Sequence, residues 1–185
     1  EIAVHGLRQV LDLFAGTGQL GIECLSRGAA GAVFVDRDRD AVSIVKDNLK
    51  TCGMKATVLQ EDSISFLNHC GKFDVIFIDP PYDSDLYESA LKIINLVDIL
   101  SEGGIIICEA RREKVLPEMT EPYRKRSARS SMENIGAVFE ELTAIQTMTL
   151  SNICAVRRMM FRCPRVIGSK LPGQIAILIY AGSLV

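Results

Sequence analysis

The segment Asp79-Pro80-Pro81-Tyr82 carries side chains that suit the transfer of a group to an amine. It follows the apolar run 76–78, so it falls where a buried strand ends. The exocyclic amine of a nucleobase is a poor nucleophile because its lone pair is delocalised into the ring, so an enzyme must accept its N–H bonds and align the nitrogen with the group donor. The Asp79 carboxylate and the Pro80 carbonyl are suitable acceptors, Pro81 stiffens the turn, and Tyr82 can stack on an unstacked base. We therefore predict a catalytic turn made of these four residues; the alternative is that the prolines only end a strand.

A second segment, 10–21 (VLDLFAGTGQLG), places a strand, a tight glycine turn and a helix start in succession. Gly16 and Gly18 allow positive φ and let a ligand approach the backbone closely. Together with Gly21 they meet the spacing G-x-G-x-x-G. That spacing is typical of nucleotide-binding turns, including those of nicotinamide enzymes.

Three acidic residues at the ends of predicted strands help to decide between cofactors. Asp12 lies four residues before the first glycine, where a carboxylate could hold an ammonium group but would repel a pyrophosphate. Asp36 could accept hydrogen bonds from both hydroxyls of a ribose, and Asp62 could accept one from an adenine amino group. These roles favour S-adenosylmethionine over a dinucleotide. The alternative is that the three carboxylates only cap helices.

The predicted cofactor-binding residues follow these strand ends. They are Asp12, Phe14, Ala15, Gly16, Thr17, Gly18, Asp36, Arg37, Asp62 and Ser63. Asp38 and Asp40 suit a helix cap or solvent, and Arg37, although it belongs to the set, also suits a solvent-exposed turn with Arg39. With His5 and His69 as the only histidines, a multi-histidine metal site is excluded, and no metal is predicted.

The elements that must position these residues alternate along the first two thirds of the chain. Short β-branched or apolar runs predict strands over 10–14, 32–36, 56–60, 73–79 and 104–109, and amphipathic stretches predict helices near 19–27, 38–52, 63–70 and 85–100. The apolar runs 75–78 and 105–108 do not alternate, as is typical of strands buried on both faces. The pattern predicts an α/β, Rossmann-like fold with a mostly parallel, doubly wound sheet and a C-terminal antiparallel strand.

After Pro117 this alternation stops. The basic, serine-rich segment 123–131 is interpreted as a linker or exposed loop, and apolar spacing predicts a helix over 132–150. Segments 155–163 and 174–180 are predicted to form a terminal hairpin around the turn-rich stretch 164–173. We expect a single domain over 1–185, with a core over 1–117, a segment of different pattern over 118–172 and a last strand over 173–181.

Composition narrows the class of protein further. The 185 residues are 48% apolar with a mean hydropathy of +0.21, enough for a substantial core, but no apolar run approaches the roughly 20 residues of a membrane span. The net charge of −2 hides a split, because 1–117 carries 12 basic and 18 acidic side chains, whereas 118–172 carries nine and five. Six cysteines without a C-x-x-C pair indicate buried, reduced thiols in a cytoplasmic protein. The first residues show neither a signal peptide nor an initiator methionine, so we expect a fragment.

Residues 10 to about 117 resemble the RsmD-type ribosomal RNA guanine-N2 methyltransferases of the small subunit, a branch of the class I S-adenosylmethionine-dependent fold. The stretches that carry the resemblance are LDLFAGTGQLGIECLSRGA (11–29), VFVDRDRDAV (33–42), EDSISFL (61–67) and FDVIFIDPPYDSDLYESAL (73–91). The segment 173–180 is similar to the family's last strand. The family's basic N-terminal extension is not found, and 124–172 departs from the family pattern.

The resemblance implies that Asp12, Gly16, Gly18, Asp36 and Asp62 bind S-adenosylmethionine, and that Asp79-Pro80-Pro81-Tyr82 holds a target guanine. It also implies ribosomal RNA or the assembling small subunit as partner, and we expect a monomer that does not bind membranes. Because the turn at 79–82 is shared with DNA adenine-N6 methyltransferases, that activity stays open. So does a non-catalytic cofactor-binding module on the same fold, whereas a nicotinamide oxidoreductase would leave this turn unexplained.

Overall fold

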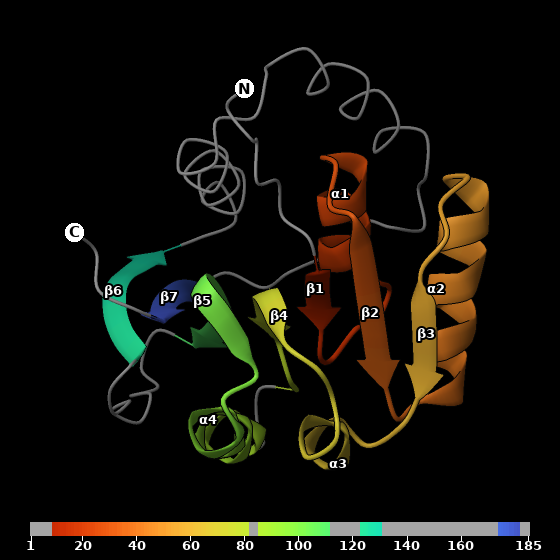
Figure 1. Cartoon of the computed structure of the whole chain (residues 1–185). Coiled ribbons are helices and arrows are strands. Elements are labelled where there is room, and N and C mark those ends of the chain that lie inside the picture. The colour runs from red at the N-terminus through yellow and green to blue at the C-terminus, as the bar shows by residue number, and fades with distance from the viewer. Residues whose placement is uncertain (1–8, 82–84, 112–122, 131–173, 182–185) are drawn as a thin grey trace, which may run out of the picture.

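A computed structural model describes residues 9–81, 85–111, 123–130 and 174–181 (Figure 1). Strands and helices alternate through the first part of the described chain and strands follow. The elements are β1 (Gln9–Asp12), α1 (Gln19–Ser26), β2 (Gly31–Asp36), α2 (Arg39–Thr51), β3 (Thr57–Gln60), α3 (Ser63–Leu67), β4 (Phe73–Ile78), α4 (Leu86–Val97), β5 (Leu100–Arg111), β6 (Tyr123–Ser130) and β7 (Gln174–Ala181). The predicted core strands and helices are confirmed with differences at their ends, the largest of them in β5.

The strands form one sheet in the order β3-β2-β1-β4-β5-β7-β6, with β3 and β6 at opposite edges (Figure 1). The first five strands in this order pair in parallel, and β7 pairs antiparallel with both β5 and β6. The chain reverses its direction of winding between β1 and β4, which is the point where open α/β sheets bind ligands. The predicted α/β fold with a C-terminal antiparallel strand is confirmed.

Successive residues of the central strands enter two different cores, one on each face of the sheet. Leu11, Ile76 and Ile78 pack in the core that contains the α3 and α4 residues Phe66, Leu67, Tyr87 and Leu91. Val10, Val75 and Phe77 pack in the other, which contains the α1 and α2 residues Ile22, Cys24, Val45 and Leu49. Both faces are therefore covered, which explains why these strands have continuous apolar sequences.

The basic segment 123–131 differs from the prediction. It was interpreted as a loop, but Tyr123–Ser130 is the edge strand β6, paired with β7. Arginine, lysine and serine are weak strand formers, and here pairing with β7 overrides that preference. The prediction failed because the partner strand lies about 50 residues further along the chain, beyond the reach of a local sequence window.

The expected hairpin at the C-terminus is also corrected. The strand at 174–180 is confirmed as β7, but β7 is hydrogen-bonded on one edge to β5 and on the other to β6. Both edges of β7 are therefore paired with segments that precede 155–163, namely β5 and β6. The predicted pairing of 174–180 with 155–163 is wrong. The predicted strand 155–163 and the predicted helix 132–150 lie outside the described residues.

Strand β5 is longer than predicted because it continues through a glycine pair. A Cβ on Gly104 would come within 2.8 Å of the Ser101 carbonyl oxygen and 3.0 Å of the Asp74 carbonyl oxygen, so β4 and β5 approach closely there. The register between them shifts at Phe73/Val75. The predicted strand began at Gly104, whereas in the structure this glycine marks an irregularity within a longer strand.

Candidate active site

The glycine turn and the proline turn leave the sheet from neighbouring strands. In the β1–β4 register Val10 pairs with Val75 and Asp12 with Phe77, and the Leu13 amide continues the ladder by donating to the Phe77 carbonyl at 3.2 Å. Because the two strands are parallel, both turns emerge at the same edge of the sheet. The structure therefore brings together the two segments that the sequence singled out.

Backbone hydrogen bonds hold the glycine turn against β2. The Ala15 amide donates to the Val35 carbonyl at 3.0 Å, and the Gly18 amide closes the turn on the Ala15 carbonyl at 2.6 Å. Gly16 and Gly18 have φ of 53° and 77°, the left-handed region that the sequence predicted for them. The turn is thus fixed in a conformation that glycine adopts without a steric penalty.

The two glycines differ in what surrounds them. A Cβ on Gly18 would lie 3.1–3.3 Å from the side chains of Val45 and Phe34, whereas a Cβ on the exposed Gly16 would meet nothing within 4 Å. Gly18 therefore serves packing as well as conformation. Gly16 leaves its outer side open to a ligand.

Helix α1 and helix α2 hold the rest of this turn. A Cβ on Gly21 would overlap the ring of Phe34, so the third glycine serves close packing of α1 on β2. The Thr17 carbonyl accepts a hydrogen bond of 2.9 Å from the side-chain amide of Asn48, which is buried on α2. Sequence reasoning missed Asn48; its signal is a polar residue at a helical position whose neighbours Val45 and Leu49 are core.

Asp12 lies beneath the glycine turn. Its side chain is 2% exposed, and one carboxylate oxygen accepts a hydrogen bond of 3.0 Å from the Gly21 amide in the first turn of α1. Burial, and then the charges of Asp12 and Glu23, raise the pKa of the neighbouring Cys24 thiol. The contact with Gly21 is the helix-capping arrangement that we gave as the alternative, so Asp12 supports the turn from below.

Asp36 joins the end of β2 to the glycine turn. One carboxylate oxygen accepts from the Gly16 amide and the other from the Asp38 amide, each at 2.9 Å. A carboxylate oxygen has two lone pairs, so each oxygen retains capacity for a second donor. The side chain is partly exposed, and its hydrogen bond from the Gly16 amide holds it against the glycine turn. It is therefore placed where a diol next to the turn would find two acceptors.

The charged residues after Asp36 have the structural roles expected of them. The Asp38 carboxylate caps α2 by accepting a hydrogen bond of 2.8 Å from the Asp40 amide. Arg37 and Arg39 are exposed. The interpretation of this stretch as a cap and a solvent-exposed turn is confirmed.

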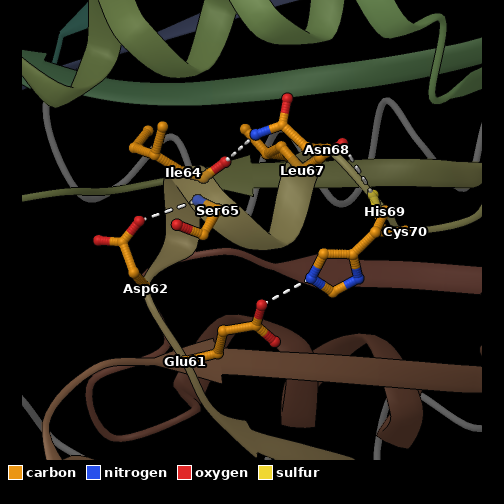
Figure 2. A network of polar contacts seen from close by, with 8 residues as sticks. All are labelled: Glu61, Asp62, Ile64, Ser65, Leu67, Asn68, His69 and Cys70. Atoms are coloured by element: carbon orange, nitrogen blue, oxygen red, sulfur yellow. Dashed lines mark hydrogen bonds and ion pairs between the residues drawn. The ribbon is translucent and has the colours of Figure 1, made fainter.

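Asp62 and Ser63 end the third strand region and begin α3. The exposed Asp62 caps that helix, with one carboxylate oxygen accepting from the Ser65 amide at 2.8 Å (Figure 2). The buried Ser63 hydroxyl donates to the Leu13 carbonyl at 2.5 Å. Ser63 therefore ties the turn that carries Asp62 to the strand that carries the glycine turn.

A second, exposed contact braces the same turn. The His69 Nε2 atom lies 2.6 Å from a carboxylate oxygen of Glu61, so the residue before Asp62 is linked to the segment that follows α3 (Figure 2). The His69 ring also meets Phe66 edge to face, with ring centroids 5.5 Å apart. This pair was not predictable from the local pattern, because Glu61 and His69 become neighbours only once α3 is formed.

The proline turn continues directly from the buried end of β4. Ile78 is fully buried, Asp79 is partly buried, Pro80 is buried and Pro81 is exposed. Asp79 therefore lies between the buried end of β4 and the exposed Pro81, partly accessible from the surface. Tyr82 lies outside the described residues, so its predicted stacking role stays a prediction.

Other chemistry is limited in the described part of the chain. Among those residues no group of three or more histidine, cysteine, aspartate or glutamate side chains could hold a metal ion, and no helix is long and apolar enough to cross a membrane. Cys24 and Cys108 are fully buried, and burial raises the pKa of Cys108 to about 12. The interpretation of the cysteines as buried thiols is confirmed for Cys24 and Cys108, whereas Cys52 and Cys70 are only partly buried and Cys154 and Cys163 lie outside the described residues.

Curated proteins similar to this chain carry methyltransferase names. A Bacillus subtilis protein named "Putative rRNA methyltransferase YlbH" is 45% identical over 114 residues, which are 58% of this chain and 62% of that protein. A Haemophilus influenzae protein named "Ribosomal RNA small subunit methyltransferase D" is 35% identical, and the aligned part covers 58% of this chain and 59% of that protein. An Escherichia coli protein of the same name is 36% identical, and the aligned part covers 59% of this chain and 56% of that protein. The chain thus spans about three fifths of the length of these relatives.

Solved structures share the fold. The Escherichia coli protein described as "Putative methyltransferase yhhF" superposes with a TM-score of 0.69 at 22% identity, covering 97% of this chain and 79% of that one. A Haemophilus influenzae methylase structure gives 0.67 at 22% identity, covering 98% and 90%. The model of the family described as "Conserved hypothetical protein 95" matches residues 3–139, past the point near 117 where the resemblance was expected to end. This chain therefore belongs to that family, which confirms the RsmD-type membership predicted from its motifs.

Proposed function

We propose that this protein is an S-adenosylmethionine-dependent methyltransferase that modifies the exocyclic N2 amine of a guanine in small-subunit ribosomal RNA. The observation that carries the proposal is the emergence of the glycine turn and the Asp79-Pro80-Pro81 turn from the adjacent parallel strands β1 and β4. Relatives whose names state small-subunit ribosomal RNA methylation support the choice of substrate.

The cofactor would lie across the glycine turn. The open side of Gly16 gives a ligand access to the backbone, and the remaining lone pairs of Asp36 would accept the two ribose hydroxyls. Asp62 would use its second carboxylate oxygen for the adenine amino group while it caps α3. Asp12 would act from beneath, by holding the start of α1 through Gly21. The proposed set also includes Phe14, Ala15, Thr17, Gly18, Arg37 and Ser63.

The target amine would be held by Asp79 and its neighbours. S-adenosylmethionine, when bound, supplies a methyl group on a sulfonium, so that the N–C bond forms as the S–C bond breaks. The Asp79 carboxylate and the Pro80 carbonyl would accept the two N–H bonds of the amine and orient its lone pair toward that methyl group. The amine loses one proton after transfer, and the Asp79 carboxylate would accept it. Pro81 would keep the turn rigid and Tyr82 would stack on the base.

We propose that residues 1–185 form one methyltransferase domain, with the divergent segment 118–172 inserted before the last strand. Its partner would be the assembling small ribosomal subunit in the cytoplasm, and it would act as a monomer. The family match and the parallel sheet support the core of this arrangement.

The direct test is transfer of a labelled methyl group to small ribosomal subunits that lack the modification, followed by mapping of the labelled nucleotide. We expect label on the N2 amine of one guanine. A DNA duplex containing adenine serves as the comparison substrate. Label on adenine-N6 in the DNA would replace the proposal by the DNA alternative, and full cofactor affinity without transfer to either polymer would replace it by a non-catalytic cofactor-binding module.

A further inference from the structure

Strand β6 is a basic strand at the edge of the sheet. Its eight residues, YRKRSARS, contain Arg124, Lys125, Arg126 and Arg129 and no acidic residue. In the part of the chain that the structure describes, β6 pairs with β7 alone, and Figure 1 shows it at the end of the sheet opposite β3. Four basic residues therefore lie on one edge strand of the sheet, whereas the core segment 1–117 has a charge balance of −6.

The register places the end of β6 level with the proline turn. Ile78 on β4 pairs with Cys108 on β5, Cys108 pairs with Ile177 on β7, and Ile177 pairs with Ala128 on β6. Asp79 follows Ile78, and Arg129 follows Ala128. Because β6 is antiparallel to β7 and β7 is antiparallel to β5, β6 runs in the same direction as β4. Arg129 and the proposed catalytic turn therefore both lie at the C-terminal ends of their strands, on the same side of the sheet's end.

The distance between them suits a bound polynucleotide. Three strand spacings separate β4 from β6, about 14 Å in all. A nucleotide chain whose target base enters the site at Asp79 would pass β6 within a few nucleotides of that base. Arg124, Lys125 and Arg126 lie further back along the same strand, and the register shift between Lys125 and Ser127 makes Arg126 the extra residue of a bulge.

We propose that β6 is an RNA-backbone contact strand, on which Arg124, Lys125, Arg126 and Arg129 neutralise phosphates on one side of the target nucleotide. The proposal rests on the proposed function for the identity of the polymer. Phosphate neutralisation supplies a large share of the affinity of proteins for nucleic acid, and the core segment 1–117 is net acidic, whereas β6 carries basic residues alone among its charged residues. Charged residues and bulges also prevent edge strands from pairing with one another, so the test must separate RNA binding from protection of the edge.

The experiment measures binding of a 20-nucleotide oligouridylate to the full chain across a range of salt concentrations. The test variant replaces Arg124, Lys125 and Arg126 by glutamine. The matched control replaces three exposed lysines by glutamine, Lys46 and Lys50 on α2 and Lys55 after it. Its net charge changes by the same amount as that of the test variant. A third variant, Arg124→Lys with Arg126→Lys, keeps the charges and should bind RNA like the unchanged chain, because a phosphate contact needs a cation rather than a particular side chain.

We expect the test variant to lose affinity on the order of tenfold, and the slope of log K against log salt to fall by about 2, at about 0.7 per phosphate contact. The control should change neither quantity, and the cofactor affinity should be equal in all variants. Equal effects of the test and control variants would overturn the proposal. So would a test variant that dimerises with unchanged RNA affinity, because β6 would then only protect the edge.

The oligouridylate contains no guanine, so this test is independent of methyl transfer. If the unchanged chain methylates small subunits but the test variant binds oligouridylate normally, β6 is not the contact strand and the proposed function stands. If no polymer is methylated but the salt slope still falls, the contact strand stands and the proposed reaction is wrong. Should the unchanged chain fail to bind the oligouridylate, the contact strand is overturned, and the methyl-transfer assay on small subunits decides the proposed function separately.

Discussion

The glycine turn and the proline turn lie side by side, yet their rigidity has opposite causes. Gly16 and Gly18 are intrinsically permissive, and hydrogen bonds to β2, Asp36 and Asn48 fix their conformation. Pro80 and Pro81 are restricted by their own rings and have no amide hydrogen to donate. One turn therefore depends on its surroundings for its shape, and the other largely carries its shape within its own covalent structure.

This contrast matches the chemistry proposed for each turn. A cofactor with many polar groups needs close approach to the backbone and several separate partners, which glycines and strand-end carboxylates provide. An exocyclic amine needs only acceptors, and consecutive prolines present carbonyl oxygens without competing donors. Substitutions should accordingly separate cofactor binding from transfer.

The largest separation is expected for Asp79→Asn. The amide side chain keeps the shape but replaces one acceptor oxygen by a donor that opposes the target N–H, so we expect transfer to fall by at least about a hundredfold. Cofactor affinity, measured by calorimetry, should change less than twofold. Asp85→Asn is the matched control, because Asp85 is exposed in the same connection and makes no side-chain cap hydrogen bond. Normal transfer by Asp79→Asn would remove Asp79 from the proposed mechanism.

The opposite pattern is expected for Asp36→Ala. Loss of the carboxylate removes the acceptors proposed for the ribose and releases the Gly16 and Asp38 amides. At 1.5–3 kcal/mol for hydrogen bonds to a charged group, the dissociation constant of the cofactor should rise by about 10- to 100-fold. Transfer at saturating cofactor should be largely retained. Asp40→Ala, which removes an exposed acid in the first turn of α2, should bind cofactor normally; equal losses in both variants would point to net charge rather than to the position of Asp36.

The glycine spacing, the proline turn and the alternating apolar runs were enough to predict the parallel sheet and its two neighbouring turns. These features are local, and the winding rules of α/β proteins convert them into positions. A capping role for Asp12 was among the alternatives, but the particular partners of Asp12 and Ser63, the Gly21 amide and the Leu13 carbonyl, were not predictable. Each depends on a distance of 3 Å or less between segments 9 and 50 residues apart. Strand β6 was missed for the same reason, since its composition predicts a loop and only its pairing with β7 makes it a strand.

Smaller effects are expected within the glycine turn itself. Gly18→Ala should cost more stability, and Gly16→Ala should cost more cofactor affinity relative to the stability it loses. Gly18→Ala adds a left-handed alanine and a contact with Val45, so we expect a loss of about 2–3 kcal/mol in the free energy of unfolding, measured with urea and no cofactor. Gly16→Ala adds the same backbone cost without the contact and should lose about 1 kcal/mol. Because its methyl group would occupy the open side of the turn, Gly16→Ala should nevertheless show the greater loss of cofactor affinity per unit of stability lost. If both variants lose stability and affinity in the same ratio, Gly16 does not face the cofactor.

The smallest effect is expected at the Glu61–His69 pair, where rigidity again comes from surroundings rather than from the backbone. Both side chains are substantially exposed, at 31% and 59%, so solvent screening limits the contribution of the pair to stability to less than about 1 kcal/mol. Glu61→Gln should therefore shift the midpoint of urea unfolding only slightly.

The effect of Glu61→Gln on cofactor binding depends on Asp62, which follows Glu61 and is also held by its cap contact with Ser65. Since the cap and the Ser63–Leu13 tie both remain in Glu61→Gln, we expect less than a threefold rise in the dissociation constant of the cofactor. Asp62→Asn, which retains an oxygen to accept the cap hydrogen bond, should lower the affinity more. If Glu61→Gln has the larger effect of the two, the adenine end of the cofactor depends on the brace at Glu61 rather than on the Asp62 carboxylate.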